Sequence, residues 1–173
     1  MSARPLITTI VTCYNKAPWI EQCIRSVLSQ SIADSEVLVI DDASTDGSVE
    51  IVRRLEAENT GRLRTIFHLE NKGLPVTWRE AVGAARGSYI ARLDGDDWWL
   101  SDDKLEKQIA LLESSGGESK WCTPTSISLI RTIDSLARHA LKAGLSTFLK
   151  VSRKCFLREV LQTHRVGLRT PIS

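Results

Sequence analysis

The segment Asp94-Gly95-Asp96-Asp97 places three carboxylates within four residues, directly after the apolar run Tyr89 to Leu93. Two ionised carboxylates about 4 Å apart repel by roughly 1 kcal/mol in water and about 4 kcal/mol near a protein surface. A folded chain keeps such groups together only when something compensates their charge. A hard divalent cation that carries a phosphate would do so, because such ions prefer oxygen ligands. The spacing therefore predicts a metal-dependent site for a phosphorylated ligand.

The same residues have simpler interpretations, which the pattern alone leaves open. Asp96 and Asp97 could cap the next helix, or all three acids could be solvated in a turn, since short acidic patterns are common. The functions of the following Trp98 and Trp99 are also left open, because tryptophan stacks on sugars and also packs in protein cores. Position in the fold has to decide between these interpretations.

Strand-like and helical patterns alternate along the first 114 residues. Strands are predicted over Leu6 to Cys13, Val37 to Ile40, Leu63 to Phe67 and Tyr89 to Leu93. Apolar residues at helical spacing follow each of them, with helices expected from Ile20, after Gly47, from Gly73 to a stop at Gly87, and from Lys104. Strict alternation of this kind predicts an α/β fold, a three-layer, mostly parallel sheet with helices on both faces.

Polar loops follow three of the four predicted strands. They are Thr12 to Asn15, Asp41 to Ser44 and Asp94 to Asp96. Ligands of open parallel sheets bind beyond the carboxyl ends of the strands. The sequence therefore predicts that one crevice collects all three loops.

Five segments in this order resemble a known family. They are Thr8 to Lys16, Ser26 to Gln30, Val37 to Gly47, Asn71 to Gly73, and Ala85 to Asp97. Together they resemble the inverting glycosyltransferases of family 2, whose catalytic domain has the Rossmann-like GT-A fold and binds a nucleotide-sugar. The resemblance covers about residues 6 to 114, so the N-terminal, nucleotide-sugar-binding part is expected and the enzyme is expected to be truncated. The segment Thr77-Trp78-Arg79 departs from the family pattern, which leaves a phosphate-binding role of Lys72 or Arg79 open.

The resemblance implies a role for each candidate site residue. Thr12 and Tyr14 would line the nucleobase pocket, and Asp42 would accept a hydrogen bond from the imide N–H of uracil. This suits a pyrimidine, which needs a flat partner and an acceptor, although a core tyrosine and a helix-capping aspartate remain alternatives. Asp94 would lie near the ribose or the metal, and Asp96 would bind a Mn or Mg ion that bridges the two phosphates. Asp97 would support these groups or cap a helix.

The implied activity is transfer of a sugar, with inversion, from a nucleotide-diphosphate sugar to an acceptor. A UDP-sugar is the expected donor, and the acceptor, a glycan, a lipid-linked molecule or another compound, is unknown. The metal would stabilise the negative charge that develops on the diphosphate leaving group. Inversion also requires a carboxylate base, but beyond residue 120 only Asp134 and Glu159 are acidic and no catalytic residue is assigned. The alternative is a noncatalytic nucleotide-binding or regulatory module, or an inactive truncated enzyme.

Charge divides the chain into two expected regions, 1–120 and 121–173. The first carries 14 Lys and Arg against 19 Asp and Glu, a net of −5, and the second carries 9 against 2, a net of +7. An amphipathic helix is predicted from Leu129 to Leu141, with a second basic stretch to about Leu161. This tail could pack on the sheet, dock on a partner, contact an anionic membrane, or be a frameshift product foreign to the fold.

Composition and motifs exclude several other classes. The chain lacks the Gly-x-Gly-x-x-Gly and P-loop patterns of dinucleotide and triphosphate sites, its three histidines have no metal spacing, and nucleic acid is not an expected partner. The beginning lacks the apolar core of a secretory signal, and Cys13, Cys23, Cys122 and Cys155 show no Cys-x-x-Cys pairing. These features predict a cytoplasmic protein with reduced thiols, with contact of its basic tail with the inner face of the membrane left open.

Overall fold

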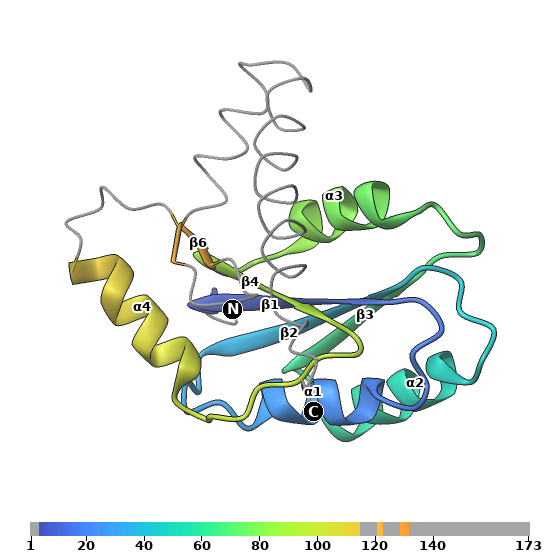
Figure 1. The fold of residues 1–173 in the computed structure, drawn as a ribbon, viewed down its shortest axis with the longest axis horizontal. Helices are drawn as coiled ribbons and strands as arrows, with labels where there is room; N and C mark the ends of the chain where they lie inside the picture. The colour runs from blue at the N-terminus through green and yellow to red at the C-terminus, as the bar shows by residue number, and fades with distance from the viewer. Residues whose placement is uncertain (1–3, 115–120, 123–128, 132–173) are drawn as a thin grey trace, which may run out of the picture. The chain divides into compact units, whose positions relative to one another are not determined.

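The computed structural model describes residues 4–114, 121–122 and 129–131. Six strands in this part of the chain form one sheet in the order β3-β2-β1-β4-β6-β5 (Figure 1). The four parallel strands are β1 (Ile7–Cys13), β2 (Ser35–Asp41), β3 (Leu63–Phe67) and β4 (Tyr89–Asp94). Their order along the chain and their direction confirm the predicted fold class.

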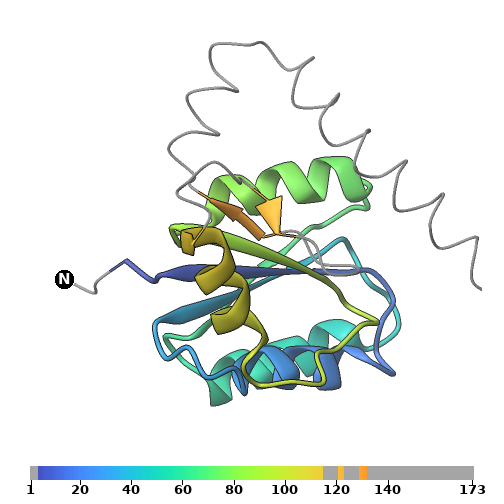
Figure 2. The ribbon, with the colours of Figure 1, turned by 60° about the vertical axis from the view of Figure 1, so that its left-hand side comes forward.

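Four helices cover the two faces of the sheet. They are α1 (Ile20–Leu28), α2 (Ser48–Glu58), α3 (Leu74–Ala84) and α4 (Lys104–Ser114). Figures 1 and 2 show α3 on the side of the sheet opposite to α1 and α2. Buried residues of α1, α2 and α4 share one apolar cluster, and buried residues of α3 belong to a second cluster. The result is the predicted three-layer arrangement.

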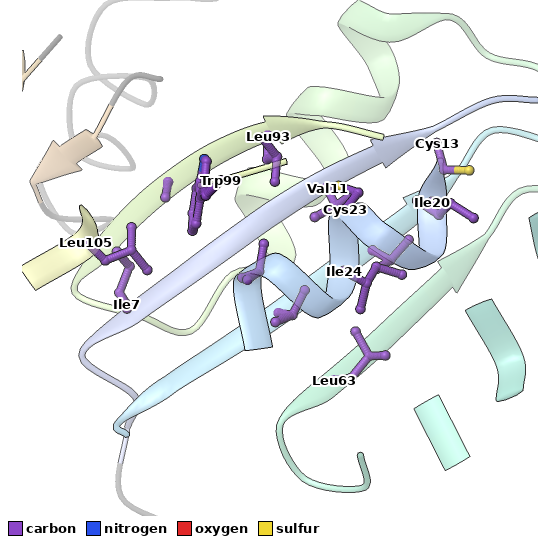
Figure 3. Packing of buried hydrophobic residues seen from close by; sticks show 14 of the residues in the cluster. Ile7, Val11, Cys13, Ile20, Cys23, Ile24, Leu63, Leu93, Trp99 and Leu105 are labelled. Carbon is purple, nitrogen blue, oxygen red and sulfur yellow. The ribbon is translucent and has the colours of Figure 1, made fainter. Parts of the chain in front are cut away.

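Strand β1 is buried along its whole length because helices cover both of its faces. Ile7, Val11 and Cys13 point into the larger cluster, and Ile10 points into the smaller one, as the two-residue period of a strand requires. Figure 3 shows the larger cluster from close by, with Ile20 and Ile24 of α1 beside Val11. Such a continuous apolar run is typical of a central parallel strand.

Two short strands continue the sheet beyond residue 120. β5 (Trp121–Cys122) pairs with β6 (Leu129–Arg131), which pairs antiparallel with β4. The prediction that Leu129 begins an amphipathic helix is therefore wrong, since Leu129 belongs to a strand. The rest of the predicted tail helix lies outside the described residues.

Gly87 has a different function from the predicted one. The expected helix stop lies earlier, because α3 ends at Ala84 and Ala85 is already extended. A Cβ atom on Gly87 would lie 2.4 Å from the backbone nitrogen of Thr8 and 2.6 Å from the carbonyl carbon of Ile7. Glycine is therefore required here because the chain entering β4 passes directly against β1.

We expect Gly87→Ala to lower the free energy of unfolding by about 3 kcal/mol, the upper range for overpacking a core, because backbone atoms cannot move aside. The measurement is denaturant unfolding of the purified chain. Gly83→Ala is the matched control, because Gly83 is exposed in α3 with no atom within 4 Å of an added Cβ. Alanine in a helix stabilises by up to about 1 kcal/mol relative to glycine, so equal losses in the two variants would contradict the close-approach explanation.

Candidate functional site

A cavity of about 470 Å³ opens at the carboxyl ends of the parallel strands. It lies where the strand order reverses, since the chain proceeds from β1 to β2 on one side and later returns to β4 on the other. All five candidate residues from the sequence line it, namely Thr12, Tyr14, Asp42, Asp94 and Asp96. Residues that also line it include Cys13, Lys16, Asn71, Gly73, Leu74 and Thr77.

Register between β1 and β4 places Thr12 directly beside Asp94. The Thr12 hydroxyl donates a hydrogen bond to Oδ1 of Asp94 over 3.2 Å, and the Arg92 guanidinium donates to both carboxylate oxygens over 3.1 and 3.2 Å. Three contacts therefore fix the orientation of the Asp94 carboxylate at the end of β4.

Asp96 is paired with a lysine from the opposite loop. The ammonium of Lys16 lies 2.6 Å from Oδ2 of Asp96, and both side chains are partly exposed. Between the two acids, the Gly95 amide donates to the Thr12 carbonyl over 2.9 Å, and a Cβ on Gly95 would lie 2.8 Å from that oxygen. The middle residue of the Asp94-Gly95-Asp96 turn must therefore be glycine for the turn to lie against β1.

Asp97, the next residue, is exposed and does not cap a helix, because α4 begins only at Lys104. Its amide donates to the Asp94 carbonyl over 2.9 Å. Burial, followed by the nearby negative charges of Asp96 and Asp94, raises the pKa of the Asp97 carboxyl. The capping interpretation is therefore wrong, and the site carries negative charge that its own cations do not fully compensate.

The acids fit a hard divalent ion as a partial ligand set. Among the residues that the structure describes, no group of three or more His, Cys, Asp or Glu side chains is arranged to hold a metal ion. Asp94 and Asp96 supply two carboxylates of the oxygen type that Mg²⁺ and Mn²⁺ prefer, and such ions commonly take their other ligands from substrate phosphates and water. The donor chemistry fits an ion that arrives with a diphosphate.

Asp42 is buried after β2, on the opposite side of β1 from Asp94, and it has three hydrogen-bond donors in addition to the nearby Thr77 side chain. The donors are Nδ1 of His68 over 2.6 Å and the backbone amides of Lys72 and Gly73, each over 2.9 Å. Although burial raises the pKa of Asp42, the hydrogen bonds from His68 and the two amides outweigh it and lower the pKa overall. Asp42 does not cap α2, so that alternative is wrong.

The loops around Asp42 are held in tight turns. Ala43 has a positive φ of 64°, a strained value for a residue with a side chain, and Asn15 has a φ of 54°. The amide of Ser44 donates to Asp41 over 2.8 Å, and the amide of Thr45 donates to the Asn15 side chain over 2.9 Å. The first bond holds the loop that follows β2, and the second joins it to the loop that follows β1.

The aromatic candidates have different positions. Tyr14 is 48% exposed at the cavity, so it is not a core tyrosine. Trp99 is buried in the larger apolar cluster, and Trp98 is 41% exposed. Of the two tryptophans, Trp99 therefore has the packing function.

Sequence reasoning missed His68 and Glu80. The sequence shows only that His68 has no metal spacing, whereas the structure places its ring between Asp42 and Glu80. Lys72 pairs with Glu80 and is not among the cavity-lining residues, nor is the exposed Arg79. Asp134 and Glu159, the acids of the tail, lie outside the described residues, and so does Cys155, whereas Cys13 and Cys23 are buried free thiols.

The model of the family described as glycosyl transferase family 2 matches residues 8–169. The chain belongs to glycosyl transferase family 2. This confirms the resemblance found in the sequence. The match also continues past residue 114, where the recognised motifs end.

Several glycosyltransferases resemble the chain over part of its length. TuaG of Bacillus subtilis (strain 168), named for teichuronic acid biosynthesis, is 38% identical over 109 residues, which is 63% of this chain and 42% of TuaG. A hyaluronan synthase of Pasteurella multocida is 37% identical over 102 residues, which is 59% of this chain and 10% of the synthase. The chain therefore spans less than half the length of these relatives.

Solved structures show the same fold. The mannosyltransferase PcManGT from Pyrobaculum calidifontis, in complex with GDP-Man and Mn²⁺, superposes with a TM-score of 0.65 at 24% identity over 83% of this chain and 48% of that one. S. aureus TarS 1-349 in complex with UDP-GlcNAc gives a TM-score of 0.56 at 27% identity over 62% and 31% of the two chains. Within the described part of the chain, no helix is long and apolar enough to cross a bilayer.

We expect Asp42→Asn to lower the free energy of unfolding by about 1–3 kcal/mol, because an amide cannot accept all three hydrogen bonds and turns an N–H₂ toward donors. The measurement is denaturant unfolding at several pH values. The pKa of Asp42 is lowered in the folded state. The stability difference between wild type and Asp42→Asn therefore reaches its maximum above about pH 4, the ordinary aspartate range. This difference decreases as the pH falls through the pKa of Asp42 in the folded protein.

Asp34→Asn is the control, because Asp34 is an exposed acid next to β2. We expect it to change stability by less than about 0.5 kcal/mol, as is usual for surface positions. A pH-independent loss in Asp42→Asn would contradict the assignment.

Proposed function

We propose that this chain is the donor-binding part of a metal-dependent, inverting glycosyltransferase that uses a UDP-sugar. The observation that carries the proposal is the single cavity that collects Tyr14, Asp42, Asp94 and Asp96. Asp42 follows β2 and the two other carboxylates follow β4, on opposite sides of β1, and Tyr14 follows β1. A nucleotide-diphosphate sugar needs a flat partner and an acceptor for its base, and a site that holds a cation for its diphosphate.

The nucleobase would lie between Thr12, Tyr14 and Asp42. Tyr14 offers a flat face for stacking, and Asp42 offers an acceptor. His68, two backbone amides and the Thr77 side chain surround the Asp42 carboxylate and favour its ionised form. An ionised carboxylate only accepts hydrogen bonds, and it would accept the imide N–H of uracil. TarS, which resembles this chain, is a protein whose structure contains UDP-GlcNAc, which also supports a uridine donor.

The diphosphate would lie at Asp94 and Asp96 with a Mg or Mn ion. When bound, the ion supplies stabilisation of the charge that develops on the leaving diphosphate. Arg92 and Thr12 keep Asp94 oriented, and Lys16 compensates Asp96 before the ligand arrives. The carboxylate that takes the proton of the attacking hydroxyl is not assigned to a described residue.

The relatives support a function in cell-surface polysaccharide biosynthesis. TuaG is named for teichuronic acid and the Pasteurella enzyme for hyaluronan, so a glycan or lipid-linked acceptor is proposed. The buried free thiols Cys13 and Cys23 suit a reducing compartment, which supports a cytoplasmic location. The net charge of +7 on residues 121–173 supports contact with an anionic membrane surface.

A noncatalytic nucleotide-binding module is the second candidate. It is motivated by the proton-accepting carboxylate, for which no described residue is assigned. The discriminating measurement is release of UDP from UDP-sugars in the presence of candidate acceptors. Metal-dependent transfer by the chain eliminates the noncatalytic candidate, whereas binding of UDP without release at any acceptor supports it.

We expect the chain to bind UDP more tightly with Mg²⁺ or Mn²⁺, and Asp96→Asn to lose about tenfold or more of this metal-dependent gain, because the substitution removes a charged metal ligand. The measurement is calorimetric titration with UDP at fixed metal concentration. Asp103→Asn is the control, since Asp103 pairs with Lys107 and does not line the cavity. Absence of UDP binding, or a metal effect unchanged in Asp96→Asn, counts against the proposal.

A further inference from the structure

His68 lies buried between two carboxylates. Its side chain is 3% exposed, Nδ1 lies 2.6 Å from Oδ1 of Asp42, and Nε2 lies 2.8 Å from Oε2 of Glu80. Ionised carboxylates can only accept hydrogen bonds, and a neutral imidazole carries one N–H. Two simultaneous hydrogen bonds to carboxylates therefore require the doubly protonated ring.

Both carboxylates are held in the ionised form. Although burial raises the pKa of Asp42, hydrogen bonds from His68 and from two backbone amides lower it overall. Hydrogen bonds from Lys72 and then from His68 lower the pKa of Glu80. Both groups therefore remain charged acceptors at neutral pH.

Four charged residues, which we call the His68 cluster, surround the ring. They are Asp42 after β2, His68 after β3, Lys72 before α3 and Glu80 within α3. The Lys72 ammonium lies 3.2 Å from Oε1 of Glu80. The backbone amide of His68 donates to the Asp41 carbonyl over 2.9 Å, while the Asp41 carboxylate accepts from Ser44. Two anions and two cations therefore balance when the ring is protonated.

The His68 cluster also holds one wall of the cavity. Asp42 accepts the backbone amides of Lys72 and Gly73, and the side chain of Lys72 is tied to Glu80. Asn71 and Gly73 of this segment line the cavity together with Asp42. Loss of a proton from His68 would leave one of the two carboxylates facing a ring lone pair, which repels it and releases one attachment of this wall.

We propose that the imidazolium of His68 is a positioning residue for the nucleobase end of the cavity, so that nucleotide affinity is lost when the ring gives up a proton. The inference rests on the proposed function, because it takes the ligand to be a uridine nucleotide. It adds a residue that does not touch the ligand and acts through Asp42 and the segment 71–73.

The test is the affinity for UDP with Mg²⁺, measured from about pH 5.5 to 8.5, the range in which histidine changes charge. His68→Gln cannot become charged. We expect it to bind UDP about tenfold more weakly than wild type at the acidic end, as the loss of a charge-assisted hydrogen bond implies, and to approach wild type as the pH rises. A terminal phosphate also titrates near pH 6, so the readout is the ratio of the two affinities at each pH.

A second variant tests the inference even if His68→Gln does not fold. Glu80 is partly exposed, and Glu80→Gln retains an acceptor but removes the charge that stabilises the imidazolium. We expect its affinity to fall at a lower pH than that of wild type. His139→Gln and His164→Gln are the controls for the other two histidines, and both should keep the wild-type profile.

The protonation state is measured directly on the wild type, by nitrogen NMR of the imidazole at about pH 6. A doubly protonated His68 ring is expected. A neutral ring, or an affinity ratio for His68→Gln that does not change with pH, would overturn the inference while leaving UDP binding intact. Absence of UDP binding at every pH would overturn the proposed function and this inference together.

Discussion

The pairing of β1 with both β2 and β4 is the constraint on which the site depends. β1 is the strand at which the order of the parallel sheet reverses, and its register places Cys13 opposite Asp41 and Thr12 opposite Asp94. The loops that follow all three strands therefore meet at one point. Burial on both faces makes this register strict, because a shift by one residue would move Val11 out of the larger cluster and Ile10 out of the smaller one. The core thus determines the geometry of the cavity.

The negative charges of Asp42 and Asp96 in this cavity are compensated in different ways. Asp42 is buried, and His68 and two backbone amides hold it, so its partners are part of the fold. Asp96 is partly exposed and has a flexible lysine as its partner. A side-chain ion pair of this kind contributes little to stability and is readily exchanged. The first end is therefore preorganised, whereas the second end can exchange its cation when a ligand brings another.

Much of the fold could be predicted because the relevant signals are local. Two-residue and helical periods identified the parallel strands and the helices, and the ends of the strands identified the polar loops. Three features escaped because their causes are not local. β5 and β6 are too short to show a period, and Gly87 is explained only by the backbone of Ile7 and Thr8. His68 is distant in sequence from Asp42 and Glu80, which give it its environment. The candidate residues around the cavity came from the resemblance, which supplied roles that spacing alone left open.

Donor binding and proton removal place different demands on the chain. A nucleotide-diphosphate needs a rigid edge with acceptors and counter-charges at fixed separation, which the parallel strands and their loops provide between Thr12 and Asp96. Removal of a proton from an acceptor needs a base placed on the far side of the reacting sugar carbon, opposite the diphosphate. In the proposed function Asp94 and Asp96 serve the leaving-group side, so neither can also be this base. Donor recognition as proposed therefore needs only the edge that carries these residues, and proton removal would need a further group.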